Sequence, residues 1–455
     1  MEKTKKIVII GGGPTGLGAA YRLRDLGYKN WTLYEQNSYF GGLSSTRTDN
    51  KGFLWDLGGH VLFSHFDYYD KFVKESLGKD HYRHQRESWI QYEDALVPYP
   101  FQNNIRYLSP EERLKCLSGL FEVDKKKQAT AKNFKEWILH MFGEGIAEKF
   151  MFPYNFSVWA TPPELMDKGW IADRVSMIDA HRALRNVILE QDDVGWGPNN
   201  TFMFPKHGGT GRIFSGGADL VKSNTVANKK VVEIDIKQKK LYFKDGSTET
   251  YNYLISAVSI NNLVKIIKSV PKTVYENAQK LTSNGVMVIG IGLKRSMKTS
   301  KCWVYFPDKN VPFYRLTYFH NYSRNNVPNG DIKKYSSLML EVAYSKYKKI
   351  NKKRVIEDSI DALIRYGILD TKDRKNIISK AMYDLPQGYP VPTLGRDKLL
   401  DRVQPYLMKH GVYSRGRFGA WKYEIANMDH SFMQGVQAVD NIISGKKEEV
   451  WKEWT

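Results

Sequence analysis

The chain has 455 residues, 42% of them hydrophobic and 13% aromatic, which argues against an intrinsically disordered protein and suggests two or three domains. Its two cysteines, Cys116 and Cys302, lie far apart without metal-type spacing, which argues against a disulfide framework or a zinc site and favours a reducing compartment. The net charge is +20, but the basic residues are scattered and no nucleic-acid-binding motif occurs, so we expect a solvated basic surface and no nucleic-acid partner.

The N-terminal stretch predicts a βαβ unit that binds a dinucleotide. Buried strands at Lys6–Ile10 and Trp31–Tyr34 flank a helix over Gly16–Leu26. The turn that joins the first strand to the helix reads G-x-G-x-x-G, with glycines at Gly11, Gly13 and Gly16. Such glycines permit a tight turn, close backbone approach to a pyrophosphate and close helix–strand packing. Glu35 ends the second strand, where its carboxylate can accept hydrogen bonds from a ribose.

A second glycine pair, Gly41-Gly42, follows Glu35 within a few residues. An NAD-dependent dehydrogenase does not need this pair, whereas the longer FAD molecule needs a second close backbone approach. We therefore favour FAD over NAD. The arrangement resembles the FAD-binding glutathione-reductase-type superfamily, on its amine-oxidase side.

Nothing in the sequence indicates a membrane partner. The start MEKTKKIVII is similar to a signal peptide, but its apolar run ends at Gly11 and becomes the glycine-rich turn. The longest later apolar stretch, around Val286–Leu293, is too short to span a bilayer. A cytoplasmic protein is the default expectation.

The expected fold class is α/β, with a discontinuous FAD-binding Rossmann-like domain. We assign residues 1–95, 202–284 and 410–455 to that domain, 105–200 to an inserted helical domain and 285–409 to an antiparallel β-sheet domain that binds substrate. Ser109, followed by proline and two acids, predicts a helix start. The last helix is expected to have Asp429 as N-cap and Gly445 as its stop, with its N-terminus toward the flavin.

Two aromatic stretches could bind a base. The segment VPYPFQNNI is predicted to be an extended, proline-stiffened strip that carries Tyr99, Phe101 and Gln102. Aromatic faces stack on bases, and an amide can pair with an imide edge. The alternative is an ordinary loop that caps a core. The segment PYNFSVWATPPE carries Tyr154, Asn155 and Trp159, and for Trp159 packing is the favoured interpretation.

Arginines and tyrosines in apolar surroundings suggest a phosphate site. Arg174 in GWIADRVS and Arg315 in PFYRLTYF have the fork geometry for bidentate phosphate contact, and a salt bridge is the alternative for each. Tyrosine hydroxyls can also bind phosphate oxygens, although tyrosine is more often a core or surface aromatic. The further candidates are Tyr389 in QGYPVP, and Arg417 and Tyr423 in RGRFGAWKY. His60, after Gly58-Gly59, either faces a ligand or points to solvent from a turn.

Read together, these stretches resemble the UDP-galactopyranose mutase family, specifically its eukaryotic-type enzymes. Motifs in family order span nearly the whole chain, and VPYPFQNN, KCWVYFP with PFYR, and GRFGAWKYE are the most specific to the family. The other carrying motifs are GGGPTGLGAA, GGHVLFSH, RESW, PYNFSVWA, GWGPNNTFMFP, GGTG, GYPVPTLGR and the C-terminal YSRGRFGAWKYEIANMDHSFMQGVQAVDNI.

The resemblance implies an isomerase that interconverts UDP-galactopyranose and UDP-galactofuranose. Such enzymes bind FAD non-covalently and work only when it is reduced. The reduced flavin N5 attacks the anomeric carbon and displaces UDP, and the flavin–sugar adduct opens, recloses as a furanose and is released by returning UDP. The net reaction is redox-neutral and needs no metal. Eukaryotic-type members take electrons directly from NADPH or NADH. The resemblance is also compatible with a homo-oligomer.

The resemblance also implies a role for each candidate residue. Arg174 and Arg315 would grip the diphosphate with the tyrosine hydroxyls, whereas His60 and Arg417 would lie near the flavin. The expected catalytic residues are Arg174, Arg315, His60 and Arg417. The expected cofactor-binding set is Gly11, Gly13, Gly16, Glu35, Gly41, Gly42, Ser44, Gly59, His60, Val232, Arg417, Asn427, Met428 and Ser431. The expected substrate-binding set is Tyr99, Phe101, Gln102 and Tyr154 around uridine, Asn155, Trp159 and Asn199 on the substrate side, and Arg174, Tyr305, Arg315, Tyr389 and Tyr423 around the diphosphate. The family usually has glutamine where this chain has Met428.

Three alternative functions stay open at this point. One is a mutase for another nucleotide sugar, such as UDP-arabinopyranose or UDP-N-acetylgalactosamine. A second is an FAD amine oxidase or desaturase that uses O2, against which the arginines and the uridine-like strip argue. A third is a flavin-bearing nucleotide-sugar sensor or nucleic-acid-associated protein without turnover, suggested by the +20 charge.

Overall fold

A five-stranded parallel sheet forms the centre of the nucleotide-binding half. The computed structural model describes residues 4–123, 125–171, 174–197 and 199–451. Within them the sheet order is β19-β13-β1-β2-β9, and every neighbouring pair is parallel. The strands are β1 (Ile7–Ile10), β2 (Trp31–Tyr34), β9 (Thr225–Val226), β13 (Tyr253–Ser256) and β19 (Val412–Ser414). Strands from three distant parts of the sequence therefore meet in one sheet, as a discontinuous domain requires.

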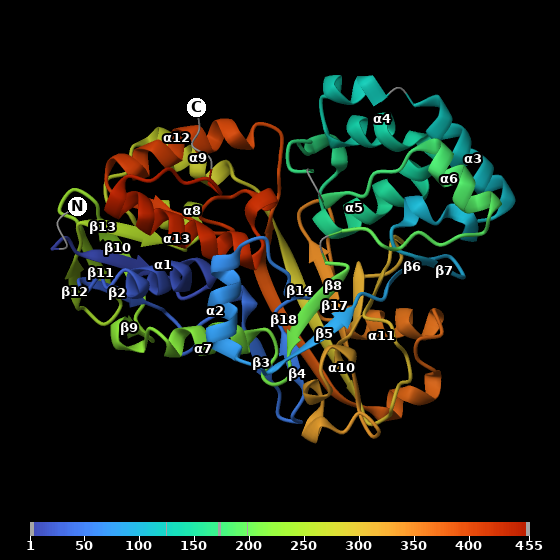
Figure 1. Cartoon of the computed structure of the whole chain (residues 1–455), viewed down its shortest axis with the longest axis horizontal. Coiled ribbons are helices and arrows are strands. Elements are labelled where there is room, and N and C mark those ends of the chain that lie inside the picture. Colours follow the sequence, from blue (N-terminus) through green and yellow to red (C-terminus); the bar gives the residue numbers. More distant parts are fainter. Residues whose placement is uncertain (1–3, 124, 172–173, 198, 452–455) are drawn as a thin grey trace.

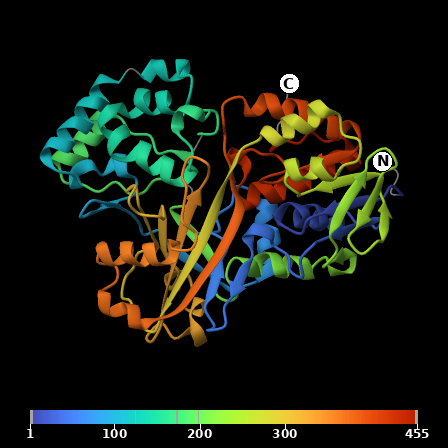
Figure 2. The same ribbon diagram turned by 180° about the vertical axis from the view of Figure 1, so that it is seen from behind.

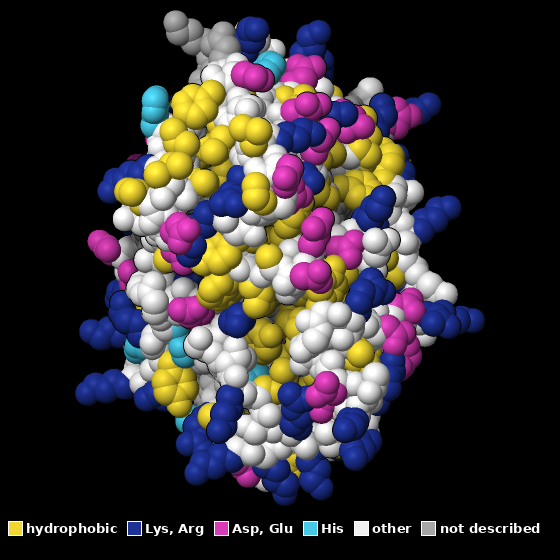
Figure 3. Space-filling view, turned by 90° about the vertical axis from the view of Figure 1, so that its right-hand side faces the viewer, with side chains coloured by type: hydrophobic (Ala, Val, Ile, Leu, Met, Phe, Trp, Pro, Cys, Tyr) yellow, Lys and Arg dark blue, Asp and Glu magenta, His cyan; other side chains and the backbone are white. Residues whose placement is uncertain are grey.

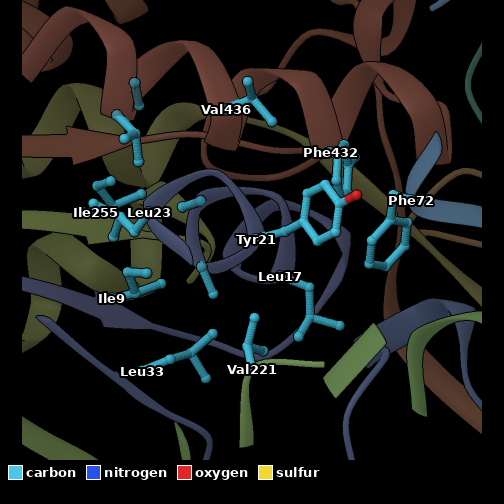
Figure 4. Close-up of a cluster of buried hydrophobic side chains, with 14 of the residues drawn as sticks. Ile9, Leu17, Tyr21, Leu23, Leu33, Phe72, Val221, Ile255, Phe432 and Val436 are labelled. Atoms are coloured by element: carbon cyan, nitrogen blue, oxygen red, sulfur yellow. The ribbon is translucent and has the colours of Figure 1, made fainter. Parts of the chain in front are cut away.

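Both faces of this sheet are covered, which explains the continuous apolar run of β1. Ile9 faces a core beneath α1 and α13, and Figure 4 shows it in the same cluster as Leu33 and Ile255. Val8 belongs to a second core on the opposite face. The elements around the first core are α1 (Pro14–Asp25), α2 (Asp67–Leu77), α7 (Gly211–Asp219) and α13 (Met428–Ser444). Those around the second are β10 (Val231–Asp235), β11 (Lys240–Phe243), β12 (Thr248–Thr250), α8 (Ile260–Ile266), α9 (Lys272–Lys280) and α12 (Arg396–Lys409).

Glycines let the first helix approach its neighbours closely. A Cβ atom at Gly16 would lie 1.9 Å from the carbonyl oxygen of Gly11. A Cβ atom at Gly435 of α13 would lie equally close, 1.9 Å, to the carbonyl oxygen of Thr15. The third glycine of the motif thus permits helix–strand packing as expected, and Gly435 lets α13 rest on the start of α1.

A seven-stranded sheet lies beside the nucleotide-binding half. Its order is β18-β14-β17-β16-β15-β6-β7, and all pairs are antiparallel except β15 with β6. Long strands β14 and β18 run between the two halves of the molecule in both Figure 1 and Figure 2. The strands are β6 (Ser88–Tyr92), β7 (Ala95–Pro98), β14 (Ser283–Leu293), β15 (Trp303–Tyr305), β16 (Arg315–Tyr318), β17 (Ser336–Tyr344) and β18 (Ile377–Pro390). Helices α10 (Phe319–Tyr322) and α11 (Val355–Arg365) pack against it.

The predicted helical insertion is present and has its own core. Its helices are α3 (Pro110–Glu122), α4 (Phe134–Ile146), α5 (Phe152–Trp159) and α6 (Ala180–Ile188). Ser109 caps α3 in a capping box with Glu112, which confirms the predicted helix start. Two small antiparallel pairs complete the fold: β3 (Thr46–Thr48) with β4 (Leu54–Asp56), and β5 (His81–Gln85) with β8 (Thr201–Pro205).

The expected fold class is confirmed, but several local expectations were wrong. The strip from Val97 to Ile105 is extended only as far as Pro100, after which a 3₁₀ helix spans Phe101–Asn103. The last helix has Asn427 as its N-cap, two residues before the predicted Asp429, although Gly445 ends it as predicted. The domain boundaries stay a prediction. Packing adds that β6 and β7 belong to the seven-stranded sheet and that α12 packs on the nucleotide-binding half.

Among the described residues, no helix is long and apolar enough to cross a membrane. On the face shown in Figure 3, Lys and Arg side chains lie scattered among acidic and hydrophobic ones. This mixture fits the expected solvated basic surface, and the absence of a nucleic-acid partner stays a prediction.

Candidate active site

A cavity of about 1210 Å³ opens at the carboxyl ends of the parallel strands and extends to the seven-stranded sheet. We call it the central cavity. Its volume exceeds the roughly 300–1,000 Å³ of typical small-molecule sites, so it can hold a large cofactor together with a substrate. The predicted site residues that line it are Gly11, Gly13, Glu35, Gly42, Ser44, Gly59, His60, Arg174, Asn199, Arg315, Tyr389, Arg417, Tyr423, Asn427, Met428 and Ser431.

One end of the central cavity fits the pyrophosphate and ribose of a dinucleotide. Helix α1 starts after Gly13 with no side-chain cap and no acidic residue in its first turn, so its first N–H groups face the cavity uncapped. Glu35 is 5% exposed, and one of its carboxylate oxygens accepts the Gly12 N–H at 2.7 Å. Its other oxygen accepts the backbone and side-chain N–H groups of Asn37 at 2.8 and 2.7 Å. The acid is thus held in place at the end of β2.

His60 presents an unpartnered polar atom beside this end. Its Nδ1 is shielded from solvent and has no hydrogen-bond partner among the described residues. Burial, together with the positive charge of Arg417, lowers the pKa of His60 to about 4. The imidazole is therefore neutral near pH 7, and His60 lines the central cavity.

We expect the depressed pKa of His60 to appear in the pH dependence of stability. Between pH 4 and its ordinary value of 6.5, the unfolded chain binds a proton at this residue and the folded chain does not. The contribution of neutral His60 is therefore complete above pH 6.5 and is lost as the pH falls toward 4. Urea unfolding across this window should show a steeper loss of stability for the wild type than for His60→Gln. Parallel curves would show that His60 does not titrate in this way.

Arg174 reaches the central cavity from the helical insertion. Its guanidinium donates 2.9 Å hydrogen bonds to the side-chain oxygen of Asn427 and to the carbonyl oxygen of Glu424. It also lies over the ring of Tyr423, 5.2 Å from the centroid. Both acceptors are neutral, so these contacts orient the cation without neutralising it. Within the described part of the chain, Arg174 is held by these two neutral acceptors and not by the salt bridge considered as an alternative.

Arg315 is held by a buried carboxylate. On adjacent strands β16 and β17, Arg315 stands opposite Glu341, and the Arg315 Nε donates to Glu341. Its Nη2 donates to the carbonyl oxygen of Gly59 at 3.2 Å. Burial alone would raise the pKa of Glu341, but the guanidinium lowers it, so the carboxylate stays ionised. The salt bridge considered as an alternative is therefore present for Arg315, which also lines the central cavity, and its phosphate role stays a prediction.

Two tyrosines and an arginine lie together in the wall of the central cavity. The rings of Tyr389 and Tyr423 lie 5.8 Å apart, and Arg417 lies over Tyr389 at 5.2 Å. Burial raises the pKa of Tyr389, so its hydroxyl stays protonated and can donate a hydrogen bond. Trp159 is 2% exposed and packs behind Tyr423 at 4.6 Å, which agrees with the packing interpretation.

The predicted uridine residues gather beside the central cavity but do not line it in this structure. Tyr305 contacts the rings of Tyr99 and Tyr154 at 5.4 and 5.2 Å. The buried Phe101 stacks on Phe150 at 4.7 Å. The side-chain N–H of Gln102 is donated to the carbonyl oxygen of Ser176. Asn155, which was expected on the substrate side, likewise donates its side-chain N–H to the carbonyl oxygen of Met151. The base-binding role of this aromatic cluster stays a prediction.

The lining of the central cavity differs from the predicted cofactor-binding set at a few positions. Val231 lines the central cavity, whereas the side chain of Val232 is 40% exposed, because alternate residues of a strand face opposite sides. Gly16 and Gly41 are absent from the lining, and Gly16 instead serves helix packing.

Sequence reasoning missed two residues that organise the site. Glu341 is a single acid in the apolar strand SSLMLEVAY, and that isolation is a signal of a buried partner. Arg86 is 7% exposed and donates to Asn199 at 2.8 Å and to the carbonyl of Val194 at 3.1 Å. It thereby positions the loop that carries Asn199, and no local pattern in RESW indicates this.

Comparison with known proteins assigns the class. The family of flavin-containing amine oxidoreductases matches residues 14–345, so the chain belongs to that family. A crystal structure of reduced UDP-galactopyranose mutase is 44% identical and superimposes with a TM-score of 0.92, over 99% of this chain and 98% of that one. Within the family, the chain is therefore a member of the UDP-galactopyranose mutases. The eukaryotic type stays a prediction.

The more distant matches either share the fold or cover a short segment of this chain. A structure described as a protoporphyrinogen oxidase from Exiguobacterium sp. 255-15 is 15% identical, with a TM-score of 0.74 over 97% of this chain and 99% of that one, and it shares the fold. The 4,4'-diaponeurosporene oxygenase of Staphylococcus aureus is 46% identical over 59 residues, which are 13% of this chain and 12% of that protein.

Proposed function

We propose that this chain is an isomerase that interconverts UDP-galactopyranose and UDP-galactofuranose and requires reduced FAD. One observation carries the proposal. A single cavity has a dinucleotide-type glycine turn at one end and two oriented guanidinium groups, Arg174 and Arg315, at the other. A flavin with no phosphate-bearing substrate would not need the second feature.

FAD fits the residues present. The uncapped start of α1 would hold the pyrophosphate, Glu35 the ribose, and the start of α13 together with His60 would face the flavin. When bound and reduced, FAD would supply the nucleophile that the family resemblance implies. The chain's own residues bind and orient the two ligands around it.

The arginines would stabilise the leaving diphosphate. Departure of UDP places negative charge on a phosphate oxygen, and Arg174 and Arg315, which their own contacts already orient in the central cavity, would stabilise that charge. The protonated hydroxyl of Tyr389 would add a neutral donor. Asn199, held by Arg86, lines the same cavity and would contact the sugar.

NADPH or NADH is proposed as the direct reductant, because the chain resembles eukaryotic-type members. A cytoplasmic location is proposed on the two cysteines, Cys116 and Cys302, which are both buried and free. A homo-oligomer remains compatible with the proposal. Mixing either nicotinamide with the oxidised holoenzyme under nitrogen should bleach the flavin absorbance, and no bleaching with either would exclude direct reduction.

Met428 offers a test of how the chain tunes its flavin. It is the first residue of α13 and lines the central cavity, where the family usually has glutamine. Met428→Gln is expected to raise the midpoint potential of the bound FAD, because an amide N–H can stabilise the anionic reduced flavin. The exposed Met382→Gln on β18 is the control. A potential that is unchanged or lower in Met428→Gln would contradict this placement.

The function is tested by product analysis. Holoenzyme reduced with dithionite under nitrogen is incubated separately with UDP-galactopyranose, UDP-arabinopyranose and UDP-N-acetylgalactosamine, and the nucleotide sugars are separated by chromatography. We expect a furanose product from the galactose substrate, in amounts many times the enzyme concentration. A product only from another UDP-sugar would reassign the substrate. Net substrate oxidation with peroxide formation in air would instead support an oxidase.

A further inference from the structure

Two histidines and one aspartate from opposite ends of the sequence meet next to the central cavity. His65 follows the loop that carries His60. Asp429 and His430 lie in the first turn of α13, and Asp429 comes 364 residues after His65 in the sequence. One ligand atom from each of the three side chains lies within 4.8 Å of the others. No local spacing in the sequence connects His65 with the adjacent pair Asp429 and His430.

The carboxylate is buried and the histidines remain accessible. Asp429 is 1% exposed, whereas the side chains of His65 and His430 are 41% and 18% exposed. The two carboxylate oxygens contact one imidazole each, His65 Nδ1 at 2.8 Å and His430 Nδ1 at 3.0 Å. The imidazole rings lie 5.1 Å apart. Both Nδ1 atoms therefore point at the same carboxylate.

We propose that His65, Asp429 and His430 form a binding site for a divalent transition-metal ion of the zinc class. Zinc is bound by imidazole nitrogen and carboxylate oxygen at about 2.0–2.2 Å, and three protein ligands leave one position for water. The ion would take the place of the hydrogens between Nδ1 and the carboxylate. Each neutral imidazole would then carry its proton on Nε2. Magnesium and calcium prefer all-oxygen surroundings and are not expected to bind.

The surroundings favour a reversible site over a structural one. The start of α13 carries the positive end of the helix dipole, which opposes a cation, and the single carboxylate of Asp429 offsets it. Phe63 and Phe66 pack on the His65 ring at 5.6 and 6.3 Å and border the site. Asp429 also lines the central cavity, so a bound ion would bridge the His60 loop and the start of α13 in the cavity wall.

The test uses FAD-loaded protein without an affinity tag, titrated with ZnCl₂ in competition with a chromophoric zinc indicator. We expect one tight Zn²⁺ per chain in the wild type and no competition by MgCl₂. His65→Gln and His430→Gln should each weaken that binding by roughly tenfold or more, since each removes a ligand. The control is His207→Gln, because exposed His207 also pairs with an aspartate, Asp80, but is not part of the three-ligand group.

A structural measurement keeps the proposal testable if a variant fails to retain FAD. Crystals of the wild type soaked in ZnCl₂ should show an anomalous peak at the zinc edge between the three side chains. The proposal would be overturned by the lack of such a peak at saturating zinc, by a wild type that binds no zinc, or by binding that survives both histidine substitutions.

Discussion

Arg174→Met is expected to lower kcat/KM for UDP-galactofuranose by roughly 10²–10³-fold while FAD content and melting temperature stay close to the wild type. The guanidinium lines the central cavity, and its two hydrogen bonds go to neutral oxygens of Asn427 and Glu424. Its removal therefore takes away charge that would face the diphosphate without leaving a buried carboxylate unpaired. Steady-state kinetics with the reduced holoenzyme measure the effect.

Two further variants sharpen this prediction. Arg174→Lys keeps the charge but loses the fork geometry, so its activity should fall between the wild type and Arg174→Met. Arg185→Met removes an exposed arginine from helix α6 of the same insertion and should be neutral. Wild-type turnover in Arg174→Met would remove this residue from the diphosphate site.

Arg315→Met is expected to lose both activity and stability. Its partner Glu341 is 2% exposed, and removal of one member of a buried ion pair typically costs about 3–5 kcal/mol because the other charge is left uncompensated. Thermal unfolding should therefore begin at a lower temperature than in Arg174→Met. Turnover should fall to a similar or greater extent, because Gly59, to which Arg315 also donates, adjoins His60.

The double variant Arg315→Met/Glu341→Gln separates the two effects. The glutamine is neutral and keeps an oxygen that can accept the N–H of Gly59 and the hydroxyl of Tyr314. We expect it to regain most of the lost stability and almost none of the lost activity. If activity returned together with stability, Arg315 would be a structural residue and not a ligand of the diphosphate.

Local sequence signals predicted the elements that depend on local chemistry. The glycine turn, strands β1 and β2 and the capping box of α3 each follow from a few neighbouring residues. The signals failed where distant packing decides. Asp429 looks like an N-cap, but its carboxylate turns to His65 and His430, and Asn427 precedes the first turn instead.

The candidate site could be predicted where a single residue is unusual for its local sequence. Arginines in apolar stretches, such as Arg315, indicated buried charge, and the structure places Arg315 and Arg174 in one cavity. Pairings across strands were not visible: the contact of Arg315 with Glu341 depends on the register of β16 against β17. The meeting of His65 with α13 depends likewise on the closure of the whole nucleotide-binding half.

The proposed reaction is an isomerisation that consumes no reductant yet requires a reduced flavin. The most direct measurement incubates UDP-galactofuranose under nitrogen with oxidised holoenzyme and with the same preparation reduced by dithionite, and follows UDP-galactopyranose by chromatography. We predict many turnovers per flavin from the reduced enzyme and none above background from the oxidised enzyme. Equal conversion by both forms, or no conversion by a fully reduced enzyme, would contradict the account.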